Sequence, residues 1–131
     1  MTRINVVPVQ ELSDQWLIAE YRELPRALKC NISIEDAPNN YVLGSGHVKW
    51  ARKHAIFTNR RMKSIIQEMN YRGFRVNFLA NFNSYIKDNM RNDYRLNSND
   101  IELNKNRLIE KYNKKPSFYK WTKREKPYYL K

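Results

Sequence analysis

Residues 11–29 read ELSDQWLIAEYRELPRALK, and this stretch decides the first element of the fold. Its apolar side chains recur at i, i+4, i+7 and i+11, which is the spacing of one face of an α-helix. The stripe consists of Leu17, Tyr21, Leu24 and Leu28. A helix over residues 11–29 is therefore expected to pack this stripe into the core.

A different side of the same helix combines charged residues with a tryptophan. At about 100° per residue, Trp16, Arg22, Glu23 and Arg26 fall together there, turned away from the apolar stripe, and Pro25 is expected to bend the helix. Glu23 has two interpretations. It forms a surface ion pair with Arg26, three residues on, worth a few tenths of a kcal/mol, or it stabilises a cationic sugar and moves protons during an elimination.

Two further helices are expected later in the chain. One runs from about residue 49 or 51 to 71 and is closed by Gly73. Its inward face is Ala55, Met62, Ile65, Ile66 and Met69, and its exposed side is Arg52, Lys53, Arg60, Arg61 and Lys63. The other spans roughly 100–114, where Asn99 and Glu102 resemble a capping box.

The remaining segments show no clear period. Residues 30–43 are expected to form a connection and GSGHV at 44–48 a turn. In residues 74–97 neither the helical nor the strand period dominates, which leaves their conformation open. The tail PSFYKWTKREKPYYLK at 116–131 is either a docked arm or a nucleic-acid contact. The expected fold class is mostly α: one compact domain over residues 1–131, with about three main helices and long irregular connections.

The charge of the chain points to a polyanionic partner. Its 131 residues carry 25 Lys and Arg against 13 Asp and Glu, a formal net charge of +12. Residues 1–46 hold four basic and six acidic residues, so the rest of the chain carries +14. These basic residues alternate with tyrosine and tryptophan, which favours nucleic acid over an acidic membrane surface.

The sequence gives no support for a disulfide-bonded, exported, membrane-spanning, zinc-binding or nucleotide-binding protein. Cys30 is the only cysteine, which excludes an intrachain disulfide and fits a reducing, intracellular setting. No apolar run reaches the length of a signal peptide or a membrane span. His47 and His54 lack the flanking residues of a zinc site, and GSGHV lacks the ending of a phosphate loop, so no metal or cofactor is expected.

The chain opens MTRIN, which places a small residue second. Removal of Met1 would leave the amine of Thr2 at the N-terminus, with an unperturbed pKa of about 7.7 to 8.0 and hence a useful unprotonated fraction. Nearby Arg3, Arg22 or Arg26 would lower that pKa further by like-charge repulsion. Such an amine is a ready nucleophile.

Four blocks together resemble one known family. They are MTRIN at 1–5, AEYRELPR at 19–26, YVLGSGHVKW at 41–50 and RLIEKYNKKPSFYKW at 107–121. In this order they resemble the phage pyrimidine-dimer DNA glycosylases of the endonuclease V type. The resemblance implies that the Thr2 amine attacks C1′ of the dimer's 5′ nucleotide, forms an imine with the opened sugar, and uses Glu23 to assist glycosidic cleavage and β-elimination.

The resemblance also implies how such a protein holds its substrate. Arg3, Arg22 and Arg26 would contact phosphates around the lesion, as would the basic pair Arg107 and Lys111, and the adenine opposite the lesion would be flipped out of the stack. Tyr119, Lys120 and Trp121, which belong to the family's aromatic tail motif, would lie against DNA or pack in the core. The expected partner is lesion-containing double-stranded DNA, bound by a monomer in the cytoplasm of a bacterial or phage-infected cell.

Two departures from the family pattern bear on the substrate. Trp16 stands where the family has a histidine, and an indole cannot transfer a proton but can stack on a base. The segment at 27–40 is shorter than the family's basic stretch and contains Glu35 and Asp36, which predicts a different lesion preference or salt dependence. The alternatives are a glycosylase for another damaged or modified base and a non-catalytic basic DNA-binding protein.

Overall fold

The computed structural model describes residues 4–131. Within this range the chain forms four α-helices, short 3-10 turns and irregular connections, and it contains no strand. The helices are α1 (Asp14–Lys29), α2 (His47–Lys53), α3 (Ala55–Arg72) and α4 (Ser98–Lys114). The mostly α prediction is confirmed, but its helix number of about three is too low.

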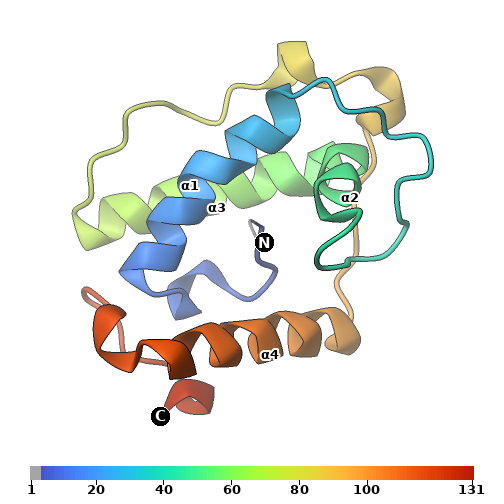
Figure 1. The fold of residues 1–131 in the computed structure, drawn as a ribbon. Coiled ribbons are helices and arrows are strands. Elements are labelled where there is room, and N and C mark those ends of the chain that lie inside the picture. The colour runs from blue at the N-terminus through green and yellow to red at the C-terminus, as the bar shows by residue number, and fades with distance from the viewer. Residues whose placement is uncertain (1–3) are drawn as a thin grey trace.

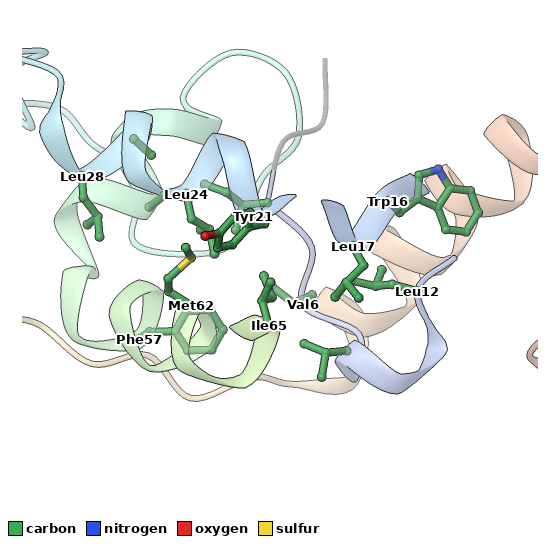
Figure 2. Packing of buried hydrophobic residues seen from close by; sticks show 14 of the residues in the cluster. Val6, Leu12, Trp16, Leu17, Tyr21, Leu24, Leu28, Phe57, Met62 and Ile65 are labelled. Carbon is green, nitrogen blue, oxygen red and sulfur yellow. The ribbon is translucent and has the colours of Figure 1, made fainter. Parts of the chain in front are cut away.

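Helices α1 and α3 form the centre of the fold and cross each other (Figure 1). Ser13 begins α1, because its Oγ accepts a hydrogen bond from the Trp16 amide at 3.1 Å, and the helix continues past Pro25 to Lys29. Figure 2 shows the predicted stripe of α1 meeting Phe57, Met62 and Ile65 of α3. All four residues of that stripe are buried, as expected.

The predicted second helix is in fact two helices, which meet at His54. The backbone of His54 is not helical (φ −105°, ψ 51°) and forms an isolated bridge with Arg91. Gly46, with φ +87°, precedes α2 and leaves no room for a Cβ, which would lie 2.8 Å from Pro38. The inward face of α3 and the closure by Gly73 are confirmed.

Two arginines predicted to lie on the exposed side of the second helix are buried instead. Arg52 donates hydrogen bonds to the carbonyls of Ala27, Leu28 and Ile32. Arg61 forms an ion pair with Glu20, at 2.6 Å between Nε and Oε2. Every nitrogen of each guanidinium has a hydrogen-bond acceptor, most of them in or near α1, which offsets the cost of burying the charge.

Helix α4 begins two residues earlier than the sequence indicated. Its capping box joins Asn97 to Asp100 rather than Asn99 to Glu102. The segment 30–43 is a connection as predicted. The segment 74–97, whose conformation the sequence left open, is also a connection, with two 3-10 turns, Asn83–Tyr85 and Asp88–Met90.

The C-terminal tail is a docked arm. The indole of Trp121 donates to the carbonyl of Glu11 at 3.0 Å, and the carbonyl of Lys120 accepts from the amide of Asp14 at 2.7 Å. Arg124 then pairs with Glu68 of α3 at 2.8 Å. The arm therefore covers the beginning of α1 and ties it to the end of α3.

Candidate active site

The N-terminal segment, residues 4–7, lies between the α1–α3 pair and α4 (Figure 1) and is held by side chains rather than by a neighbouring strand. Asn104 of α4 accepts from the amides of Val6 and Val7, at 2.7 and 3.0 Å, and donates to the Asn5 side chain. Asn5 in turn donates to Glu20 of α1 at 2.9 Å. The start of the described chain is thereby fixed to both sides of the fold.

Ile4 is held by two side chains from the segment that leads into α2. Its amide donates to Nε2 of His47 at 3.0 Å, and its carbonyl accepts from the Tyr41 hydroxyl at 2.9 Å. His47 Nδ1 lies 2.7 Å from the carbonyl of Val42 and must donate there, because Nε2 is an acceptor. His47 is therefore neutral and in one defined tautomer.

Glu23 lies beside Ile4. The two residues line one cavity of about 190 Å³ together with Arg26, Ala27, Cys30, Ile32 and Val48. The Glu23 carboxylate accepts from the guanidinium of Arg26 at 3.3 Å, and its side chain is 21% exposed. A charge in this position is accessible to a substrate and is shielded on one side by apolar groups.

A second cavity shares Arg26 with the first. It measures about 280 Å³, and its lining is mostly cationic or aromatic: Arg22, Pro25, Arg26, Lys29, Phe78 and Phe82. Phe78 stacks on Tyr21 with ring centroids 4.3 Å apart, and the Lys29 ammonium lies 5.3 Å from the centre of the Phe82 ring. Flat aromatic groups beside cations suit a nucleobase and its phosphate.

The predicted site residues fall into separate groups. Thr2 and Arg3 lie outside the described residues, whereas Arg22, Glu23 and Arg26 share the two cavities. Helix α4 carries Arg107 and Lys111, both half-buried. Burial is the main cause that lowers the pKa of His47, and the positive charge of Arg107 adds a smaller contribution in the same direction.

Trp16 does not share the exposed side of Arg22 and Arg26, so that prediction is wrong. Only 6% of its surface is exposed, because its ring packs on Tyr119 and Trp121 of the docked arm, with centroids 4.5 and 6.1 Å apart. In this arrangement no face of the indole is open to a base. Lys120 is exposed beside the cluster, while Tyr119 and Trp121 are half-buried.

Three residues that hold the N-terminal segment were not found from the sequence. Tyr41 and Asn104 gave no signal as single residues, and His47 was weighed only as a zinc ligand. Their partners lie 37 to 98 positions away in the chain. Among residues 4–131 no group of His, Cys, Asp and Glu gathers in the manner of a metal site.

We expect the two buried histidines to make the protein less stable in mild acid. Burial lowers the pKa of His47 and of His54 below the ordinary value of 6.5, outweighing their hydrogen bonds to backbone carbonyls. Because the unfolded chain then binds more protons than the folded protein below about pH 6.5, the free energy of unfolding should decrease as the pH falls through that value. Urea unfolding at pH 7.5 and 5.5 measures the decrease, which should be smaller in His47→Gln. A free energy of unfolding that is constant or higher at pH 5.5 would contradict this.

No described helix has both the length and the apolar character needed to span a membrane. What the fold and the site define is a small helical protein with a strongly basic surface, an accessible carboxylate and a firmly held N-terminal segment. Residues 1–81 match the family model for pyrimidine dimer DNA glycosylases. The chain belongs to this family of DNA repair glycosylases, whose substrate is DNA that contains pyrimidine dimers.

Proposed function

We propose that the protein cuts the glycosidic bond of the 5′ nucleotide of a cyclobutane pyrimidine dimer, through an imine on its N-terminal amine, and then cuts the strand. The observation that supports this proposal is the shared cavity of Ile4 and Glu23. Thr2 precedes Ile4 by two residues, and two residues span at most about 7 Å. The Thr2 amine is therefore within reach of a substrate bound against the Glu23 carboxylate.

The reaction uses only groups of this chain and water. The unprotonated Thr2 amine attacks C1′ of the 5′ nucleotide of the dimer, and the bond from C1′ to the pyrimidine nitrogen breaks. Glu23 stabilises the positive charge that develops on the sugar. The attacking nitrogen passes a proton to the departing base, and the sugar ring opens by cleavage of the C1′–O4′ bond as O4′ takes a proton from solvent, which gives the protonated imine. Glu23 then takes a proton from C2′, the 3′ phosphate leaves by β-elimination, and water hydrolyses the imine to regenerate the amine.

Several basic residues hold the DNA in this proposal. Arg22 and Arg26 contact phosphates beside the lesion, together with Arg3, and Arg107 and Lys111 do so from α4. Lys120, with the half-buried Tyr119 and Trp121, contacts the duplex farther along, because the beginning of α1 lies nine residues, about 2.5 helical turns or about 13.5 Å, from Glu23.

Borohydride trapping tests the imine. With end-labelled duplex that carries one thymine dimer, reduction is expected to link the DNA to the protein, and peptide mapping is expected to place the link on Thr2. Protein that retains Met1, identified by its mass, or that is acetylated at Thr2 should give no link, because the nucleophile is blocked. A link on another residue, or none with Thr2 free, would refute the proposal, and salt-sensitive DNA binding without any link would leave the non-catalytic DNA-binding alternative.

The 280 Å³ cavity beside Arg26 is proposed to receive the base flipped out opposite the lesion. Phe78 is 39% exposed and supplies a stacking face. A 2-aminopurine opposite the dimer should show quenched fluorescence when bound in this cavity, and Phe78→Ala should weaken the quenching with little change in total DNA binding. Equal quenching in the variant and the wild type would place the base elsewhere.

A glycosylase for another damaged base is the second candidate, and one observation favours it. Trp16, where the family has a histidine, is buried under the arm and offers no group that could transfer a proton. An imine trapped on abasic DNA but not on dimer DNA would select this candidate.

A further inference from the structure

We infer that His47 is a positioning residue for the reaction: its neutral imidazole holds the Ile4 backbone, two residues after the proposed Thr2 nucleophile, at the cavity that Ile4 shares with Glu23. The inference rests on the proposed function and adds a residue to it. His47 itself touches no reacting atom, since its two ring nitrogens are engaged by Ile4 and Val42.

The first argument is the geometry of the anchor. The His47 ring joins the amide of Ile4, at 3.0 Å, to the carbonyl of Val42, at 2.7 Å, and 1% of the residue is exposed. The Tyr41 ring packs against the His47 ring, with centroids 5.7 Å apart, and the Tyr41 hydroxyl donates a hydrogen bond to the Ile4 carbonyl. Both backbone groups of the first described residue are thus fixed from one short segment, residues 41–47.

The second argument is the choice of side chain. The anchor needs a donor at one end of a rigid ring and an acceptor at the other, which the neutral imidazole provides. A protonated ring would present a second N–H to the Ile4 amide and break the anchor. Burial and the charge of Arg107 favour the neutral form, against the carboxylate of Glu20 and the hydrogen bond to Val42.

The third argument is the consequence of small displacements. A nucleophile works only in a narrow range of distance and angle, and a misplacement of about 1 Å can reduce the rate by about 100-fold. Asn104 fixes the segment at Val6 and Val7, but Ile4 is two or more residues closer to the amine. The anchor at Ile4 is therefore the last described restraint before the nucleophile.

A matched pair of variants separates the two hydrogen bonds of His47. In His47→Asn the amide can still donate to Val42 but cannot reach Ile4, whereas in His47→Gln the longer side chain returns an acceptor to the position of Nε2. With dimer DNA in single turnover, the rate of imine trapping should fall about tenfold or more in His47→Asn and recover to within about threefold of wild type in His47→Gln. The Kd for dimer DNA should change by less than about threefold in both.

Hydrogen exchange provides a readout that does not depend on activity. The Ile4 amide should exchange faster in His47→Asn than in wild type or His47→Gln, while the amides of Val6 and Val7 stay protected by Asn104. Circular dichroism at the assay temperature confirms that each variant is folded. A His47→Asn protein that traps the imine at the wild-type rate would overturn the inference, and so would a loss of rate fully explained by a smaller folded fraction.

A second experiment leaves His47 unchanged. Cys30 is the only cysteine, so a synthetic peptide 2–29 with a C-terminal thioester can be joined to a fragment 30–131. Replacing the Ile4 amide by an ester in that peptide removes the donor, and the rate of trapping should fall as it does in His47→Asn. An unchanged rate would refute the inference. A wild-type ligated protein that traps no imine would instead refute the proposed function, which keeps the two failures distinct.

Discussion

Replacing Glu23 by glutamine is expected to abolish strand cleavage and to leave DNA binding intact. In the proposed mechanism, the change removes both the negative charge that stabilises the sugar cation and the base that takes the C2′ proton, while the side chain keeps its size. The rate of dimer cleavage in single turnover should fall roughly 10²- to 10⁴-fold. The Kd for dimer DNA should stay the same or decrease slightly, since one negative charge facing the phosphates is lost.

Glu102→Gln is the matched control, because it makes the same chemical change at an exposed position of α4. It should cleave dimer DNA at the wild-type rate. The salt dependence of DNA binding should have the same slope in both variants, as neither removes a basic residue. Cleavage by Glu23→Gln within tenfold of wild type would show that another group acts as the base.

Replacing Arg72 by methionine is expected to cause the largest loss of stability. The Arg72 side chain is fully buried and donates to Asp14 at 2.9 Å, to Glu68 at 2.8 Å, and to the carbonyls of Val9 and Gln10. Burial alone would raise the pKa of Glu68, but hydrogen bonds from Arg124 and Arg72 lower it. Removing the guanidinium leaves buried acceptors and negative charge uncompensated, which costs about 3–5 kcal/mol.

Chemical denaturation measures this loss as the difference in the free energy of unfolding. Arg75→Met is the control, since Arg75 lies exposed just beyond the end of α3, and it should change the free energy of unfolding by less than about 0.5 kcal/mol. A loss in Arg72→Met below about 1 kcal/mol would mean that the network does not contribute to stability as its burial requires.

The sequence predicted the helices whose stability comes from a continuous apolar face. Leu17, Tyr21, Leu24 and Leu28 identified α1 because their spacing is local, and the same holds for the inward face of α3. The break at His54 carried no such signal, since neither glycine nor proline marks it. It depends on a bridge to Arg91, 37 positions away, and periodicity in a short window cannot show that contact.

In the candidate site, too, the sequence identified residues with a local signal and missed those whose role depends on distant contacts. Glu23 and its arginines were found because they lie on one helix and match a family motif. The burial of Arg52, Arg61 and Trp16 was missed, because each depends on a partner from another segment: backbone carbonyls, Glu20 and the aromatic arm. His47 was missed as an anchor because one histidine in a turn resembles an ordinary core residue until its partners are known.

The long sequence distance between the N-terminal segment and Asn104 has a consequence for how the protein is made. Val6 and Val7 obtain their side-chain acceptor from a residue almost 100 positions later, so this restraint cannot form until α4 has left the ribosome. At about 5–20 residues per second, synthesis of the intervening chain takes roughly 5–20 s. During that interval residues 6 and 7 lack this restraint. In the proposed function, removal of Met1 and exposure of the Thr2 amine therefore belong to the period of translation, before Asn104 fixes the N-terminal segment.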